Sequence, residues 1–432
     1  MEVTEILLLV ISFLVLLSLG VPISFSIGIS SLVTMLVTIK PLPALTTISQ
    51  RMATGLDSFA LLAIPFFILA GQIMNSGGIA RRLIEFAKVL VGKLPGGLAF
   101  VNIMAAMLFG AISGSAVAAA SAIGGFMTPI MKKEGYDPAF SAAVNITSAT
   151  TGMIIPPSNI LIVYSLASGG VSIAALFLAG YLPGIFLGLG LMFVAAVIAK
   201  KRGYKVEMQI TLSEGIKKFL DAIPSLLLII IVIGGIVAGY FTATEASAIA
   251  VFYALILAVF VYKEVKFRDL PQILLSSAVT TSVVLLLIGT SMAMSWVMAY
   301  ENIPQSVAAG LMGISDNPVI IFLIINLILL FVGTFMDMTP AVLIFTPIFL
   351  PVAIQLGYDP IHFGIIIVFN LCIGLCTPPV GSVLFVGCSV AGLPLTRVIR
   401  PMIPFFIAMI IVLMLVTYIP EISLLIPEYF GY

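Results

Sequence analysis

Long apolar runs constrain the fold of this chain more than any other feature of its sequence. Several runs extend for about 20 residues, the length that a helix needs to cross the hydrocarbon core of a membrane. Of the 432 residues, 61% are hydrophobic and only 9% are charged, whereas a soluble domain carries roughly a quarter charged residues. A transmembrane barrel would instead show short alternating strands. The sequence therefore predicts an all-α polytopic membrane protein and excludes a water-soluble enzyme.

Charge and reactive side chains argue against several other classes. The formal net charge is +1, so no basic field indicates nucleic-acid binding. The three cysteines and the single histidine lack the paired spacing of a transition-metal site, and no P-loop sequence for ATP occurs. An intramembrane enzyme would need a nucleophile–base pair or a metal cluster, and the sequence offers neither. We therefore expect no enzyme activity and no cofactor.

Basic residues define the predicted cytoplasmic loops. By the positive-inside rule, 17 of the 19 basic residues fall in five cytoplasmic clusters. These are Arg81, Arg82, Lys88 and Lys93; Lys132 and Lys133; Lys200, Lys201, Arg202, Lys205, Lys217 and Lys218; Lys263, Lys266 and Arg268; and Arg397 and Arg400. The remaining loops are neutral or carry acids such as Glu2, Glu5, Asp316 and Asp359. Both termini are thus predicted outside, and the acidic N-terminus is read as a retained first span rather than a signal peptide.

Two segments begin and end on the same predicted side of the membrane. Residues 98–131 run between two basic clusters and have Ser113, Gly114 and Ser115 at their middle. Residues 317–355 run between two acidic loops, with a helix-breaking stretch at 333–340. We interpret both as re-entrant helical hairpins that enter from opposite faces. The alternative is two ordinary spans per segment, with arms of only about 17–19 residues, at the lower limit for a span.

An internal repeat follows each predicted hairpin, with a constant offset between its two copies. Residues 135–138 (Gly-Tyr-Asp-Pro) recur at 357–360, and the proline pair at 156–157 recurs at 378–379. Asp followed by Pro is a strong helix start, and each proline pair should break the helix. This predicts broken helices at 138–168 and 360–390, although prolines in membrane helices can also be simple kinks. The charge map inverts the two copies, a signature of secondary transporters with a site near the membrane midplane.

The repeat suggests a division of the chain into four parts. Residues 1–75 are expected to be N-terminal scaffold spans, at 6–20, 22–39 and 58–75. Residues 76–199 form the first repeat, 200–270 a cytoplasmic loop with a central pair of spans, and 271–432 the second repeat. The less apolar segments 76–97 and 301–316 are expected to be arms that lie along the membrane interface.

The helix breaks are suited to binding sodium, because interrupted helices expose carbonyl oxygens and sodium prefers oxygen ligands. Asp337 is the one acid that this topology leaves deep in the membrane, where an acid is functional by default. Its alternative role is a hydrogen bond to the hairpin backbone. The sodium candidates are Ser113, Gly114, Ser115, Gly152, Pro156, Pro157, Gly333, Thr334, Asp337, Thr377 and Val380.

A substrate is expected between the two hairpin tips. No basic residue lies at either break, so an anion would depend on hydroxyls, amides and helix N-termini. Many of these hydroxyls can instead bond their own helix backbone. The substrate candidates are Ser115, Asn145, Ser148, Thr150, Thr151, Ser158, Asn159, Asn370 and Ser382.

Four motifs together resemble one transporter family across essentially the whole chain. They are residues 58–71 (SFALLAIPFFILAG), the Ser-Gly-Ser hairpin tip, the repeated Gly-Tyr-Asp-Pro, and the two breaks at 155–158 and 377–381. The chain is similar to the large membrane subunit of TRAP transporters, the tripartite ATP-independent periplasmic transporters of bacteria.

The resemblance implies a sodium-driven importer of organic acids such as sialic acid, C4-dicarboxylates or sugar acids. It also implies an elevator mechanism in the inner membrane with both termini periplasmic, a soluble periplasmic substrate-binding protein, and a small four-helix membrane subunit as a separate chain. In that family the sodium sites lie at the hairpin tips and the proline breaks. The competing interpretation is a stand-alone sodium/anion symporter of similar architecture; a channel would not need two opposed hairpins.

Overall fold

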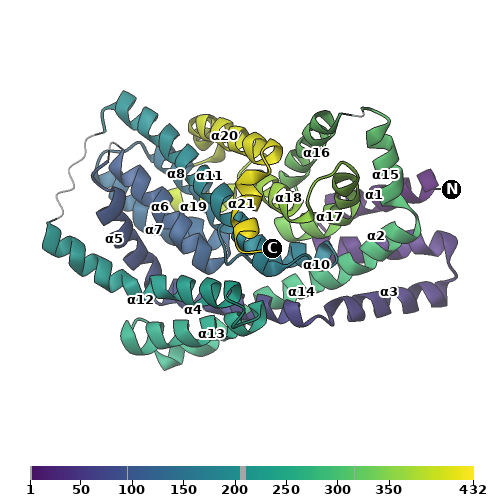
Figure 1. Ribbon diagram of the computed structural model, residues 1–432, viewed down its shortest axis with the longest axis horizontal. Coiled ribbons are helices and arrows are strands. Elements are labelled where there is room, and N and C mark those ends of the chain that lie inside the picture. The colour runs from purple at the N-terminus through teal and green to yellow at the C-terminus, as the bar shows by residue number, and fades with distance from the viewer. Residues whose placement is uncertain (1, 95, 205–210, 316) are drawn as a thin grey trace.

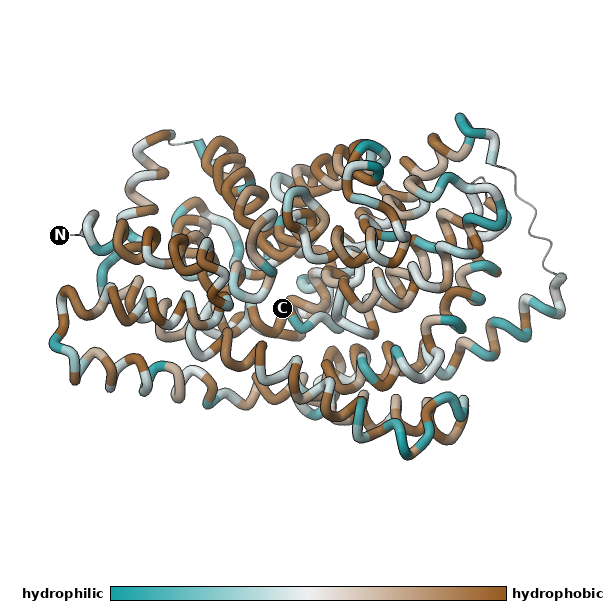
Figure 2. Tube along the Cα trace, turned by 180° about the vertical axis from the view of Figure 1, so that it is seen from behind, coloured by the Kyte–Doolittle hydropathy of each residue, from teal (hydrophilic) through white to brown (hydrophobic). Residues whose placement is uncertain are grey.

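The computed structural model describes residues 2–94, 96–204, 211–315 and 317–432. Lys205 and Asp316, which the orientation argument uses, lie outside these ranges. The described residues form helices and no strands (Figure 1). Seven helices are long and apolar enough to cross a membrane, or eight if one bent pair counts as a single span. Figure 2 shows hydrophobic residues over most of these helices. The predicted all-helical membrane fold is therefore confirmed.

One layer of the molecule holds the N-terminal helices and the central pair. α14 packs against α2, α3 and α4, while α13 packs against α4 and α12, so these helices form a row along one edge (Figure 1). The bounds are α1 Glu2–Ser18, α2 Ile23–Thr38, α3 Pro41–Leu56, α4 Ala63–Ser76, α12 Leu212–Val237, α13 Ala243–Leu255 and α14 Leu270–Tyr300. A short 3₁₀ turn, Phe59–Leu62, precedes α4, and a π-helical segment, Ile256–Val261, extends α13.

Two features of this layer differ from the sequence-based expectation. α3 was not predicted, because polar residues such as Gln50 and Arg51 interrupt its apolar pattern. Glu5 was expected in an outer loop, and this was wrong: it lies within α1 and is only 3% exposed. The helix of the apolar run from Ile6 onward begins at Glu2, so Glu5 falls in its first turn.

The other layer contains the two predicted hairpins, each a helix, a short turn and a second helix. The first is α6 (Gly97–Ser113) with α7 (Ala116–Lys133), and the second is α16 (Pro318–Gly333) with α17 (Met338–Gln355). The first pair packs arm against arm, whereas α16 packs mainly on α18 and α17 on α14 and α10. The predicted arms fold as α5 (Ile79–Val91) and α15 (Ile303–Met312), which lie toward opposite ends of the molecule (Figure 1).

Both predicted helix breaks are confirmed. The first helix is divided into α8 (Pro138–Ala149), α9 (Thr151–Ile154) and α10 (Asn159–Ala167), with a bend of 50°. The second is divided into α18 (Pro360–Gly374) and α19 (Ser382–Ala391). Asp137 caps α8 through the N–H groups of Ala139 and Phe140, at 2.7 and 3.0 Å. Asp359 caps α18 in the same way, so the Asp-Pro starts are helix N-termini as predicted.

The constant offset between the two copies extends beyond the sequence motifs to the helix boundaries. α7 and α17 begin at 116 and 338 and end at 133 and 355, and α8 and α18 begin at 138 and 360. α11 (Ile173–Arg202) and α20 (Leu395–Tyr418) begin at 173 and 395. The two copies also exchange partners, because α10 packs on α17 and α19 packs on α7. The C-terminal helix α21 (Glu421–Tyr429), which was not predicted, packs on α11.

Polar contacts join α5 to the first layer at one end. The Arg82 side chain is 10% exposed; its Nε lies 3.4 Å from Asp221, its Nη1 3.8 Å from Glu264, and its guanidinium carbon 3.5 Å from the Tyr262 ring centroid. Lys218 of α12 adds a second pair, 2.7 Å from Glu85 of α5. Arg82 is therefore the buried centre of the contact between α5 and α12.

Arg82→Ala is expected to lower the free energy of unfolding by about 1–3 kcal/mol, because a cation–π contact and two ion pairs are lost at once. The expected loss of stability is modest because Asp221 and Glu264 are partly exposed. The matched control is Arg81→Ala, which removes an exposed pair with Glu264 and should cost less than about 1 kcal/mol. Unfolding in detergent micelles measures both; equal losses would show that Arg82 is not the centre of this contact.

Candidate functional site

A cavity of about 170 Å³ lies where the hairpins and the broken helices meet. Four helices begin at its wall: α7 at Ala116, α10 at Asn159, α17 at Met338 and α19 at Ser382. A helix N-terminus carries roughly half a positive charge and unpaired N–H groups, so each one favours an anion. The described residues that line the cavity include no Lys or Arg. Four helix N-termini thus converge on a cavity whose lining carries one acid, Asp337, and no basic side chain among the described residues.

Equivalent residues of the two hairpins cap two of these helices. Ser115 and Asp337 are related by the same offset as the two Gly-Tyr-Asp-Pro copies. The hydroxyl of Ser115 accepts a hydrogen bond from the N–H of Ala118 at 3.2 Å, and the carboxylate of Asp337 accepts one from the N–H of Met338 at 2.9 Å. The hydrogen bond to the hairpin backbone, the alternative role for Asp337, is thus present. Asp337 is nevertheless exposed at the cavity, so its carboxylate is also open to a ligand.

The remaining wall comes from the other layer of the molecule. Ile64 and Ile68 of α4 and Thr280 and Val284 of α14 face the helix N-termini across the cavity. A smaller adjoining cavity of about 80 Å³ adds Gln72 and Asn75 of α4. None of these residues was a candidate from sequence. Gln72 and Asn75 stand three positions apart, on one face of an otherwise apolar helix, and that pairing was the available signal.

Each hairpin tip packs on a helix break through glycines. A Cβ added to Gly152 would lie 2.1 Å from the Cα of Gly110, and one added to Gly374 would lie 2.6 Å from the Cα of Gly333. Gly152 and Gly374 are themselves equivalent positions of the repeat. Such close approach leaves no room for a side chain between tip and break, so the two segments meet through their backbones. Sodium takes oxygen ligands, and backbone carbonyls of these segments, with Asp337, are groups of that kind.

The sequence candidates divide into those that line a cavity, those that bond within the fold, and those that form the tips and breaks themselves. Gly114, Ser115, Asn159, Asp337 and Ser382 line the cavity, and Ser113 lines the smaller one. The others bond within the fold: Asn145 donates to the carbonyl of Ala120, Ser148 accepts from Asn102, and Asn370 donates to Asn326. The hydroxyls of Thr150, Thr151, Ser158, Thr334 and Thr377 donate to carbonyls of nearby residues.

The other sodium candidates belong to the tips and breaks themselves. Pro156–Pro157 and Pro378–Pro379 are both cis peptides. Gly381 donates its N–H to the carbonyl of Thr334 at 3.4 Å, which ties the second break to the second tip. Val380 is 43% exposed. Among the described residues, no group of three His, Cys, Asp or Glu side chains is placed to hold a metal ion.

Comparisons with known proteins agree with this architecture. Residues 10–422 match the family described as "Tripartite ATP-independent periplasmic transporter, DctM component". Three relatives each align over 94–97% of this chain and 94–96% of their own length. They are the uncharacterized protein YgiK of Salmonella typhimurium at 59% identity, and the C4-dicarboxylate TRAP transporter large permease protein DctM of Pseudomonas aeruginosa and the sialic acid TRAP transporter large permease protein SiaM of Vibrio cholerae at 40% each.

A solved structure shares the fold at low sequence identity. The YdaH transporter of Alcanivorax borkumensis, described as having an unusual topology, superimposes with a TM-score of 0.62 and 14% identity. The match covers 92% of this chain and 90% of that one. The family match covers nearly the whole chain, and its members are permeases rather than enzymes. The chain therefore belongs to the DctM family, the large permease proteins of TRAP transporters.

Proposed function

We propose that this chain is the large permease subunit of a sodium-coupled secondary importer of an organic acid anion. The observation that carries the proposal is the cavity at which four helix N-termini converge. Helix dipoles and N–H groups at a low-dielectric site stabilise a carboxylate. Relatives named for C4-dicarboxylates and for sialic acid are equally similar to this chain. Both are organic acid anions, so the proposal specifies that class of substrate.

Sodium coupling is supported by the oxygen donors beside the same cavity. Asp337 lines the cavity, and the glycine contacts bring tip and break backbones together in both copies of the repeat. A sodium ion bound there would neutralise the carboxylate of Asp337 and order the tips against the breaks. The N-termini beside it would then be presented to the substrate, so ion and anion would bind cooperatively.

We also propose that the protein works by an elevator mechanism. In this proposal the two repeats are inverted and both hairpins are re-entrant. The cavity has one wall from hairpins and broken helices and the other from α4 and α14. Movement of the first group against the second would carry the bound anion across the membrane. Lys201 and Arg202 at the end of α11 and Arg397 and Arg400 at the start of α20 line one groove. This gathering of positive charge supports a cytoplasmic position for that face, and the proposed topology then leaves both termini in the periplasm.

The proposed partners are a small membrane subunit and a soluble periplasmic substrate-binding protein. The family's own description, tripartite and periplasmic, supports both, and the "large permease" names of the relatives support a smaller companion. The proposed location is the bacterial inner membrane.

Uptake into proteoliposomes tests the proposal. A panel of labelled organic acids is offered to the large subunit, the small subunit and the binding protein, with each component omitted in turn. We expect uptake only with all three components and an inward sodium gradient, and no uptake when potassium replaces sodium. Uptake by this chain alone would favour the stand-alone symporter, and uptake without sodium would contradict the proposed coupling.

A further inference from the structure

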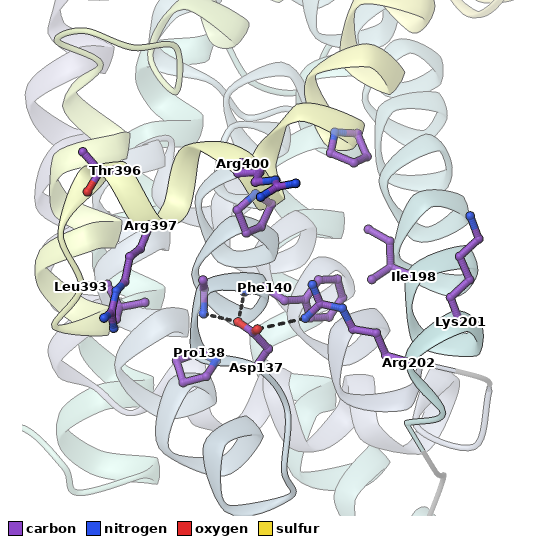
Figure 3. A pocket seen from close by; sticks show the side chains of 13 residues that line it. Asp137, Pro138, Phe140, Ile198, Lys201, Arg202, Leu393, Thr396, Arg397 and Arg400 are labelled. Atoms are coloured by element: carbon purple, nitrogen blue, oxygen red, sulfur yellow. Dashed lines mark hydrogen bonds and ion pairs between the residues drawn. The ribbon is translucent and has the colours of Figure 1, made fainter.

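A second, larger cavity lies far from the proposed substrate site. It is a groove of about 840 Å³ between the start of α8, the end of α11 and the start of α20 (Figure 3). The stretch from Pro138 to Ile155 separates it from the first helix break, about 25 Å along a helix axis. We call it the basic groove, because Lys201, Arg202, Arg397 and Arg400 line it with one acid, Asp137.

Most of this positive charge is uncompensated. Arg202 pairs with Asp137 at 3.1 Å. Burial by itself raises the pKa of Asp137, but the N–H groups of Phe140 and Ala139 and the guanidinium of Arg202 outweigh it, so this pKa lies below its usual range. Lys201, Arg397 and Arg400 are exposed and form no ion pair with any residue that the structure describes. Within the described part of the chain, three of the groove's cations therefore have no acidic partner.

The rest of the groove is apolar and opens onto a hydrophobic surface. Ile198, Leu393, Pro401 and Pro404 share the lining with the cations. Farther along α20, on the face that carries Arg400, Ile407 and Ile411 are 54% and 55% exposed. An occupant would thus meet cations at one end and exposed apolar side chains beyond them. A free inorganic anion matches only the first of these features.

We propose that the basic groove binds an acidic phospholipid, with its phosphate held by Arg397 and Arg400 and its acyl chains along α20. Arginine forks suit phosphate oxygens, and basic pockets between helices at the membrane boundary recognise anionic headgroups. Each basic side chain contributes roughly a factor of five in affinity near a membrane surface. A bound lipid would hold the start of α20 beside the start of α8. The proposal does not depend on the substrate or the coupling ion.

The test is lipid binding by purified, delipidated protein. Native mass spectrometry in detergent counts bound phosphatidylglycerol, cardiolipin or phosphatidylcholine, and thermal unfolding reports whether each one stabilises the protein. We expect the two acidic lipids to bind and stabilise the wild type, and phosphatidylcholine to do neither. In Arg397→Gln/Arg400→Gln, binding of the acidic lipids should weaken by about 30-fold. Unfolding without lipid checks that this variant folds.

The matched control is Lys132→Gln/Lys133→Gln, which removes two exposed cations at the end of α7, outside the groove. This control should bind acidic lipid as the wild type does. If both variants lose the same amount of acidic-lipid binding, the loss reflects the net charge of the protein and not the groove, and the proposal is overturned. Unchanged binding in the arginine variant would also overturn it, as would stabilisation by glycerol phosphate or inorganic phosphate at the concentrations at which the lipids act, which would indicate a soluble anion instead.

Discussion

Asp337→Asn is expected to lower sodium-driven uptake by about 10- to 100-fold, the range for losing a contact to a charged group. Asparagine is as good an N-cap as aspartate, so the hydrogen bond from the N–H of Met338 should survive. The substitution therefore removes the charge and keeps the cap. Asp337→Ala removes both, and should lower uptake to a similar degree while also destabilising α17 by about 1 kcal/mol.

Uptake at a series of sodium concentrations, together with thermal unfolding, separates these roles of Asp337. The control is Asp359→Asn, which changes a cap of the same kind at the start of α18, away from the cavity lining. It should leave uptake unchanged. If Asp337→Asn takes up substrate with the sodium dependence of the wild type, Asp337 is only a helix cap, and the sodium proposal loses its one carboxylate.

Gly152→Ala should abolish most uptake and lower the free energy of unfolding by about 1–3 kcal/mol, the usual cost of overpacking. The new Cβ would lie 2.1 Å from the Cα of Gly110, and backbone cannot rotate aside as a side chain can. The tip of the first hairpin would therefore move off the first break. Gly374→Ala should act in the same direction at the second break, where Gly333 is the neighbour.

The matched control is Gly125→Ala in α7, the second arm of the first hairpin. A Cβ at Gly125 would meet nothing within 4 Å, and alanine is the better helix former by about 1 kcal/mol. This variant should be as stable as the wild type or slightly more so, with normal uptake. Normal uptake by Gly152→Ala as well would show that the tip and the break need not touch for transport.

The elements that could be predicted from sequence are those fixed by the backbone restrictions of proline and by helix-capping residues. A proline pair must interrupt a helix, and Asp followed by Pro starts one, so the breaks and the caps at Asp137 and Asp359 could be placed within a residue or two. The matched spacing of these motifs then located the repeat. α3 was missed because its polar residues weaken the apolar pattern that identifies a span.

The candidate site was predictable only in part. Sequence places Ser115, Asn159, Asp337 and Ser382 at tips and breaks, and all four line the cavity. Asn145 and Ser148 occupy equally plausible positions, yet they bond Ala120 and Asn102 inside the fold. Which hydroxyl or amide faces a cavity depends on the rotation of each helix against its neighbours, and neighbours distant in sequence set that rotation. The wall from α4 and α14 was missed for the same reason.

The central claim is that the substrate anion is held where the N-termini of α7, α10, α17 and α19 converge. The most direct measurement is a cryo-EM map of the protein in lipid nanodiscs, with sodium and the acid that the uptake panel identifies. We predict density for the acid against Ser115, Asn159 and Ser382, with a sodium ion near Asp337. Density for the acid in the basic groove beside Arg397, or anywhere outside the four N-termini, would contradict the account.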